Sequence, residues 1–129
     1  MSEKNNIAVE EKDVWQEALE NEPWVAPIID IYETTDDFQA ILNMPGVSKE
    51  NVKLKVEENN LIIMGKINLA EVRERNYVLN ESEIGNYYRR LKISDLVDVE
   101  KIDATMENGQ LKIKLPKHER VKPKNISIK

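Results

Sequence analysis

The sequence contains no cysteine. Disulfide bonds, thiolate catalysis and cysteine-ligated metal sites are therefore excluded together, and the absence fits a reducing compartment. Histidine is nearly absent as well, since His118 is the single example and lies in a basic segment just after Pro116. One histidine gives no basis for a Ser-His-Asp triad or a histidine-ligated metal. We expect no catalytic site, no metal and no cofactor.

Long hydrophobic runs are also missing. The longest unbroken apolar stretch is Leu61–Met64, whereas a membrane-spanning helix needs about 18 apolar residues. The segment Met1–Asn6 lacks the basic-then-apolar order of a secretory signal. The four glycines stand apart at turns or strand ends and form no phosphate-binding loop. These features predict a cytoplasmic protein that does not act on membranes and is not an enzyme.

Positive charge is in the minority, with 19 Lys and Arg against 24 Asp and Glu, for a net charge of −5. No basic stripe is available to neutralise phosphates, so nucleic acid is not an expected partner. The 129 residues suit one domain with short arms. Residues 1–27 carry seven acids and two bases, whereas residues 117–129 carry five bases and one acid. Both ends are poor in apolar residues and indicate extensions rather than core.

The middle of the chain has the pattern of short strands. Val52–Val56 alternates apolar and charged residues, which predicts one buried and one solvated face. Turn signals separate the segments, above all Glu58–Asn60 and Asn108-Gly109. Seven such segments predict an all-β antiparallel sandwich. They cover residues 28–32, 38–42, 52–56, 61–64, 87–93, 102–106 and 111–115.

Two stretches break this rhythm. Residues 66–84 are too long for a tight hairpin, and they form either a mobile loop or a strand that reaches another subunit. Residues 10–21 place Val14, Trp15, Ala18 and Leu19 on one stripe of a short helix that ends before Pro23. Such a helix is too short to be stable alone in water and needs a surface to pack against.

Three motifs together resemble a known family. The first is the signature Ala104-x-x-x-Asn108-Gly109-x-Leu111, and the second is the strand Gly85-Asn86-Tyr87-Tyr88-Arg89-Arg90-Leu91. The third is the I-x-I motif of Ile126 and Ile128 near the end of the sequence. Taken together in their order along the chain, they resemble the alpha-crystallin domain of small heat-shock proteins, and the resemblance covers residues 27–128.

The resemblance implies an immunoglobulin-like sandwich with a short, partly helical N-terminal arm and an extended C-terminal tail. The arm would cover residues 1–26, the alpha-crystallin domain residues 27–117, and the C-terminal extension residues 118–129. It also implies an ATP-independent holdase that binds partly unfolded client proteins under stress. The long loop would carry a strand exchanged in a homodimer, with Leu69, Val72 and Arg89 at the dimer interface, and dimers would assemble into larger homo-oligomers.

The remaining site residues follow from the same resemblance. Ile126 and Ile128 would link subunits by entering a groove lined by Val52, Leu54, Val56, Ile102 and Ala104, although these five residues are equally suited to the core. The client-binding arm would use Val14, Trp15, Leu19 and Trp24, although this arm lacks the phenylalanines that are frequent in the family. Two alternatives stay open: an adaptor or co-chaperone module of the CS type, and a structural coat protein of the same fold.

Overall fold

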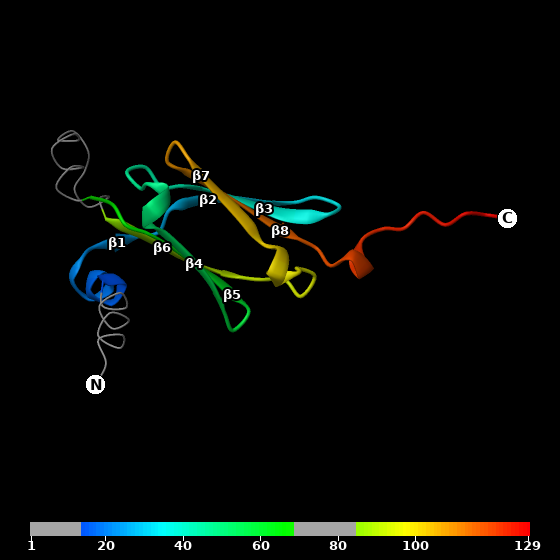
Figure 1. Cartoon of the computed structure of the whole chain (residues 1–129), viewed down its shortest axis with the longest axis horizontal. Coiled ribbons are helices and arrows are strands. Elements are labelled where there is room, and N and C mark those ends of the chain that lie inside the picture. Colours follow the sequence, from blue (N-terminus) through cyan, green and yellow to red (C-terminus); the bar gives the residue numbers. More distant parts are fainter. Residues whose placement is uncertain (1–13, 69–84) are drawn as a thin grey trace, which may run out of the picture.

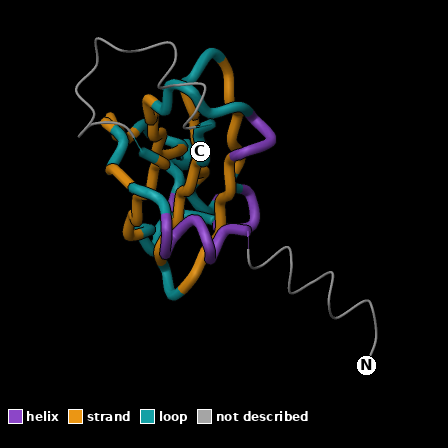
Figure 2. The backbone as a smooth tube through the Cα atoms, turned by 90° about the vertical axis from the view of Figure 1, so that its left-hand side faces the viewer, coloured by secondary structure: helices purple, strands orange, loops and turns teal. Residues whose placement is uncertain are grey.

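Two four-stranded sheets pack on each other in the computed structural model, which describes residues 14–68 and 85–129 (Figure 1). Sheet A has the order β1-β6-β5-β4 and sheet B the order β2-β3-β8-β7. Viewed along the long axis, the strands form two layers (Figure 2). Sheet A consists of β1 (Trp24–Val25), β6 (Asn86–Lys92), β5 (Asn60–Gly65) and β4 (Val52–Glu57). Sheet B consists of β2 (Ile28–Glu33), β3 (Asp37–Asn43), β8 (Gln110–Pro116) and β7 (Asp103–Glu107).

The alternating pattern of the sequence explains which faces meet. In β8 the side chains of Leu111, Ile113 and Leu115 are buried, while those of Lys112 and Lys114 are exposed. The inner faces of both sheets supply one continuous apolar core. Its fully buried large apolar members are Leu42, Met44, Leu61, Ile63, Leu111 and Ile113. The predicted sandwich is confirmed.

The two predicted hairpin turns have the expected backbone. Glu58 and Asn59 adopt φ of 50° and 63° between β4 and β5, and Asn108 and Gly109 adopt 53° and 75° between β7 and β8. Positive φ at both central positions is the geometry that matches the twist of paired strands. The described residues also include three short 3₁₀ helices: η1 (Lys49–Asn51), η3 (Val99–Lys101) and η4 (Glu119–Val121).

The first strand was not predicted from the sequence. β1 has only two residues and pairs with β6 in parallel, with Trp24 opposite Asn86 and Val25 opposite Tyr87. The close approach requires a glycine, because a Cβ on Gly85 would lie 2.8 Å from the carbonyl oxygen of Pro23. The predicted helix is present over residues 14–21 and leads directly into this strand.

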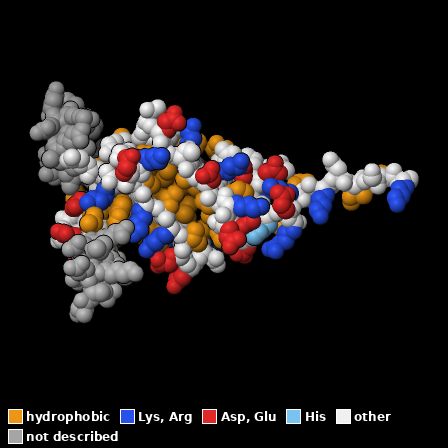
Figure 3. Space-filling view, viewed as in Figure 1, with side chains coloured by type: hydrophobic (Ala, Val, Ile, Leu, Met, Phe, Trp, Pro, Cys, Tyr) orange, Lys and Arg blue, Asp and Glu red, His pale blue; other side chains and the backbone are white. Residues whose placement is uncertain are grey.

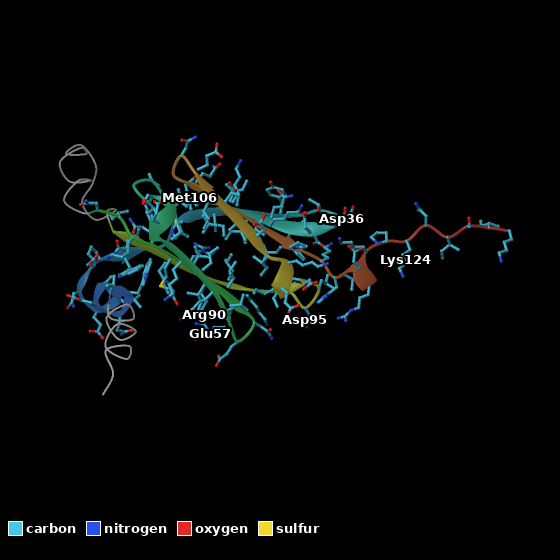
Figure 4. All side chains as sticks on the ribbon, in the orientation of Figure 1. Asp36, Glu57, Arg90, Asp95, Met106 and Lys124 are labelled. Carbon is cyan, nitrogen blue, oxygen red and sulfur yellow. The ribbon has the colours of Figure 1, made fainter. Side chains whose placement is uncertain are left out.

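The tail leaves the sandwich beyond η4. It runs in an extended conformation away from the sheets, past Lys124, to the C-terminus (Figures 1 and 4). Ile126 and Ile128 are 86% and 96% exposed. The described chain therefore holds two large apolar side chains in water, against the usual tendency of isoleucine to be buried.

Candidate functional site

The signature residues form a hairpin that is fixed to a neighbouring turn. The carbonyl oxygen of Gly109 accepts a hydrogen bond of 2.7 Å from the Met44 amide. A Cβ on Gly109 would approach the Cα of Pro45 to 3.3 Å. Leu111 follows as a core residue, and Ala104 lies across the hairpin opposite Ile113. The signature thus secures the position of β7, which is an edge strand of sheet B.

A groove of about 540 Å³ lies where β7 faces β4. Its apolar lining consists of Val52, Leu54, Ala104, Met106 and Leu111, and its polar lining of Lys49, Thr105 and Glu107. Figure 3 shows hydrophobic side chains gathered between these two strands in the middle of the visible face. Met106, which comes from β7, is labelled in Figure 4. The groove offers an apolar floor with polar edges.

Three of the five residues predicted for a tail-receiving groove line this one: Val52, Leu54 and Ala104. Val56 lies further along β4 and is 46% exposed, and Ile102 precedes β7 and packs against the core. Neither is part of the groove lining. Sequence reasoning missed Met106, although the alternation of Ile102, Ala104 and Met106 placed it on the same face.

β2 forms the outer edge of sheet B and, among the strands that the structure describes, pairs with β3 alone. Its residues Ile28, Ile31 and Tyr32 are exposed, Ile28 to 72%. An edge strand with exposed apolar side chains is a template for another strand. Arg89 reaches the start of this strand from β6, since its Nη1 lies 3.4 Å from the carbonyl oxygen of Pro27. Leu69 and Val72, the other predicted interface residues, lie outside the described residues.

The arm residues predicted to bind clients divide into two pairs. Val14 and Leu19 are exposed, whereas Trp15 and Trp24 are partly buried against sheet A. Lys53 Nζ of β4 lies 5.8 Å from the centre of the Trp15 ring. Trp24 Nε1 donates a 2.7 Å hydrogen bond to the carbonyl oxygen of Ala18, and the Trp24 ring meets Tyr88 edge-on. Much of the apolar surface of the arm is thus already in contact with its own domain.

Asn86 joins the arm to the rest of sheet A. It is fully buried, and its Oδ1 accepts a 3.0 Å hydrogen bond from the Ile67 amide. Its Nδ2 donates a 2.8 Å bond to a carboxylate oxygen of Glu22, and its own amide donates to Pro23. The other carboxylate oxygen of Glu22 lies 3.9 Å from Lys66 Nζ. One amide side chain of β6 thereby links the end of the arm to the segment that follows β5.

The turn between β2 and β3 holds the buried acid Asp37. Thr34 Oγ1 donates a 2.7 Å hydrogen bond to its carboxylate, and Lys114 Nζ lies 3.8 Å from it. The hydrogen bond from Thr34 lowers the pKa of Asp37 most, and Gln39 and Lys114 add to it against the opposing effect of burial. The ionised form is therefore the native form at this turn.

Among the described residues, no three Asp, Glu or His side chains are grouped so that they would hold a metal ion. In the same part of the chain no helix is long and apolar enough to cross a membrane. The described residues thus present an apolar groove and a strand edge, two features through which proteins recognise polypeptide segments.

A family model described as the Hsp20/alpha crystallin family matches residues 30–129. The chain belongs to this family. The family resemblance drawn from the sequence motifs and the fold that it implied are therefore confirmed, and the sequence relatives agree with it. Small heat shock protein C4 of Rickettsia felis is 34% identical over 109 residues, covering 84% of this chain and 67% of that protein. Heat shock protein 16 of Schizosaccharomyces pombe is 32% identical, covering 81% and 76%.

Solved structures of the family have the same architecture. Heat shock protein 16.0 from Schizosaccharomyces pombe superposes with a TM-score of 0.59 at 33% identity, covering 81% of this chain and 99% of that chain. A small heat-shock protein from Xylella fastidiosa, described as having a distinct high order structure, gives a TM-score of 0.64 at 24% identity, covering 81% and 97%. Membership of this family supports a chaperone role in the stress response.

Proposed function

We propose that this Hsp20-family protein is an ATP-independent holdase that captures partly unfolded proteins and keeps them from aggregating. The observation that supports it most is that the same chain presents two exposed isoleucines, Ile126 and Ile128, and an apolar groove between β4 and β7. A surface that buries apolar side chains reversibly can also take up those of an unfolding protein. The charged residues, a third of the chain, keep such complexes in solution.

The tail serves as a link between subunits. Ile126 and Ile128 point the same way on an extended segment, and Ser127 points the other way. Burying both isoleucines is worth about 3–6 kcal/mol before the cost of ordering the tail. The groove has apolar residues on both of its walls, Leu54 on β4 and Met106 on β7. The link is therefore strong enough to form and weak enough to open under stress.

The dimer forms by strand exchange along β2. No described strand pairs with its outer edge, and its exposed Ile28, Ile31 and Tyr32 would be covered by an added strand. Backbone hydrogen bonds supply the affinity in this mode of recognition. Arg89 lies at the start of the edge through Pro27, where it can pair with an acidic group of the partner. The added strand would come from residues 66–84 of the second subunit.

The holdase proposal is tested by light scattering of citrate synthase during heating, with and without this protein and without ATP. We expect the protein to suppress scattering at about equimolar amounts. Ovalbumin at the same mass concentration controls for crowding. Unchanged scattering at a several-fold excess would contradict the holdase and favour the adaptor or coat alternative.

The tail link is tested by mass photometry of the Ile126→Ala, Ile128→Ala double variant. We expect its assemblies to shrink to dimers. Ser127→Ala is the matched control, because it changes the same segment without removing apolar surface. Assemblies of full size in the double variant would rule out the link.

The dimer contact is tested with Arg89→Gly, whose dissociation constant we expect to rise at least tenfold, as for a charged pair worth about 1.4 kcal/mol. Arg90→Gly is the control, since the adjacent arginine is exposed on the opposite face of β6. Equal dissociation constants for the two variants would remove Arg89 from the interface.

A further inference from the structure

The outer face of sheet A carries apolar side chains that are as buried as those of the core. Leu61 and Ile63 of β5 point into the sandwich, so Ile62 and Met64 point out of it. Yet Ile62 and Met64 are each only 4% exposed. An outer face in contact with water alone would leave both side chains exposed, so this apolar stripe has a cover.

Basic residues flank the stripe on both sides. The register places Met64 between Lys53 of β4 and Tyr88 of β6. The next row places Ile62 between Lys55 and Arg90. The face therefore combines an apolar centre with basic margins, in which Lys55 is already paired with Glu57 of the same strand at 3.2 Å.

The helix of residues 14–21 has the complementary chemistry. Ala18 is fully buried, and the contacts of Trp15 with Lys53 and of Trp24 with Tyr88 place the segment against this face, beside sheet A in Figure 1. Between positions 14 and 25 the chain has three glutamates and no basic residue. Glu22 approaches Lys66 to 3.9 Å. An acidic amphipathic helix thus lies on a basic-edged apolar surface.

The helix of residues 14–21, which covers this face, can dissociate from it without unfolding the sandwich. Most of the stability of a helix in a protein comes from packing its apolar face, so docking on sheet A stabilises the described helical residues 14–21. Its described polar ties to the sheet are concentrated at its C-terminal end, at Glu22 and Pro23. Val14 and Leu19 stay exposed on the docked segment. Heating weakens such a local contact before it unfolds the sandwich.

We propose that the outer face of sheet A is a binding surface for short acidic amphipathic helices of partly unfolded clients, and that helix 14–21 occupies it when no client is bound. This inference rests on the proposed holdase function and names the class of segment that it captures. The arm acts as a competitor tethered next to the surface. Its release opens the stripe of Ile62 and Met64 and frees Trp15 at the same time.

The test uses the full-length chain with Ala18→Arg, because an arginine has no room at a fully buried alanine and meets the basic margins. Gln16→Arg is the matched control, since it adds the same residue on the exposed side of the helix. The probe is a fluorescein-labelled peptide of residues 14–25, stapled between positions 16 and 20, which already touch through a 2.9 Å hydrogen bond on that exposed side. Binding is read by fluorescence anisotropy.

We expect the peptide to bind the Ala18→Arg chain at least tenfold more tightly than the wild-type chain or the Gln16→Arg control. A peptide with Glu17→Lys and Glu22→Lys should bind at least tenfold more weakly than the acidic one. Lys53→Glu combined with Lys55→Glu in the opened chain should reduce the affinity for the acidic peptide by a similar factor, and added salt should weaken it.

Three results would overturn the proposal. In the first, the Ala18→Arg chain does not bind the peptide although its tryptophan emission reports a released Trp15. In the second, acidic and basic peptides bind this chain equally. In the third, the peptide dissociates wild-type assemblies, which would make the face an arm-exchange contact between copies. If Ala18→Arg leaves the helix docked, Trp15→Glu is added and the titration repeated. The readout needs no aggregating client, so the holdase proposal is judged separately by light scattering.

Discussion

Asn86→Ala should cost more stability than any other exchange of an asparagine in the described chain, because two elements share this one side chain. The variant leaves the Ile67 amide without its acceptor in the interior, which costs about 1–3 kcal/mol. It also removes the hydrogen bond to Glu22, whose partly exposed carboxylate can turn toward water and Lys66. We therefore expect a total loss of about 2–4 kcal/mol.

The loss is measured by urea unfolding followed through tryptophan fluorescence. Protein concentration must be held fixed, because association adds to apparent stability. The midpoint should fall with little change in slope, and Tm should drop by roughly 10 °C. Asn51→Ala is the control, since Asn51 is exposed and its side chain donates a 3.2 Å hydrogen bond to the exposed Ser48, so we expect a loss within about 0.5 kcal/mol. Equal losses for the two variants would refute the role assigned to Asn86.

Three further predictions concern the sandwich itself. Thr34 holds the pKa of Asp37 below its usual value, so ionised Asp37 stabilises the fold above its unfolded pKa, and this effect is lost as pH falls through the lower folded pKa. On acidification the urea midpoint of Asp37→Asn should therefore fall less than that of the wild type. Midpoints that fall in parallel with pH would contradict this. Gly109→Ala should cost about 1–2 kcal/mol, because φ is +75° and Pro45 is close, and an unchanged urea midpoint would disprove that strain. Leu111→Ala should cost about 2–5 kcal/mol by the same assay, since its side chain is buried, and a loss under 1 kcal/mol would show a core that repacks.

The strands of the sandwich could be predicted because each carries a local signal. Val52–Glu57 alternates with a period of two, and Asn108-Gly109 allows the positive φ that a tight hairpin needs. β1 carries no such signal, since two residues cannot show a period, and its position depends on the missing side chain of Gly85. Strands with a local sequence pattern could therefore be predicted, whereas the pairing of the arm strand β1 with β6 could not.

The functional surfaces were predictable only in part, for a related reason. The groove needs the spatial proximity of β4 and β7, which determines that Met106 lines it and Val56 does not. The role of Asn86 depends on contacts 19 and 64 positions away in the sequence. No local sequence pattern predicts contacts between residues so far apart in the chain, so the contacts of Asn86 with Ile67 and Glu22 are evident only from the structure.

The direction of the tail has a consequence for symmetry. Ile126 and Ile128 lie on a segment that runs away from the groove lined by Leu54 and Met106, so donor and acceptor are different patches of one subunit. A contact between unlike patches is heterologous, and it repeats until rotation closes a ring or leaves an open filament. An exchange along β2 would be self-complementary and would stop at two copies. The proposed tail link and the proposed β2 exchange together would give a building block with two donors and two acceptors, and hence assemblies with even numbers of subunits.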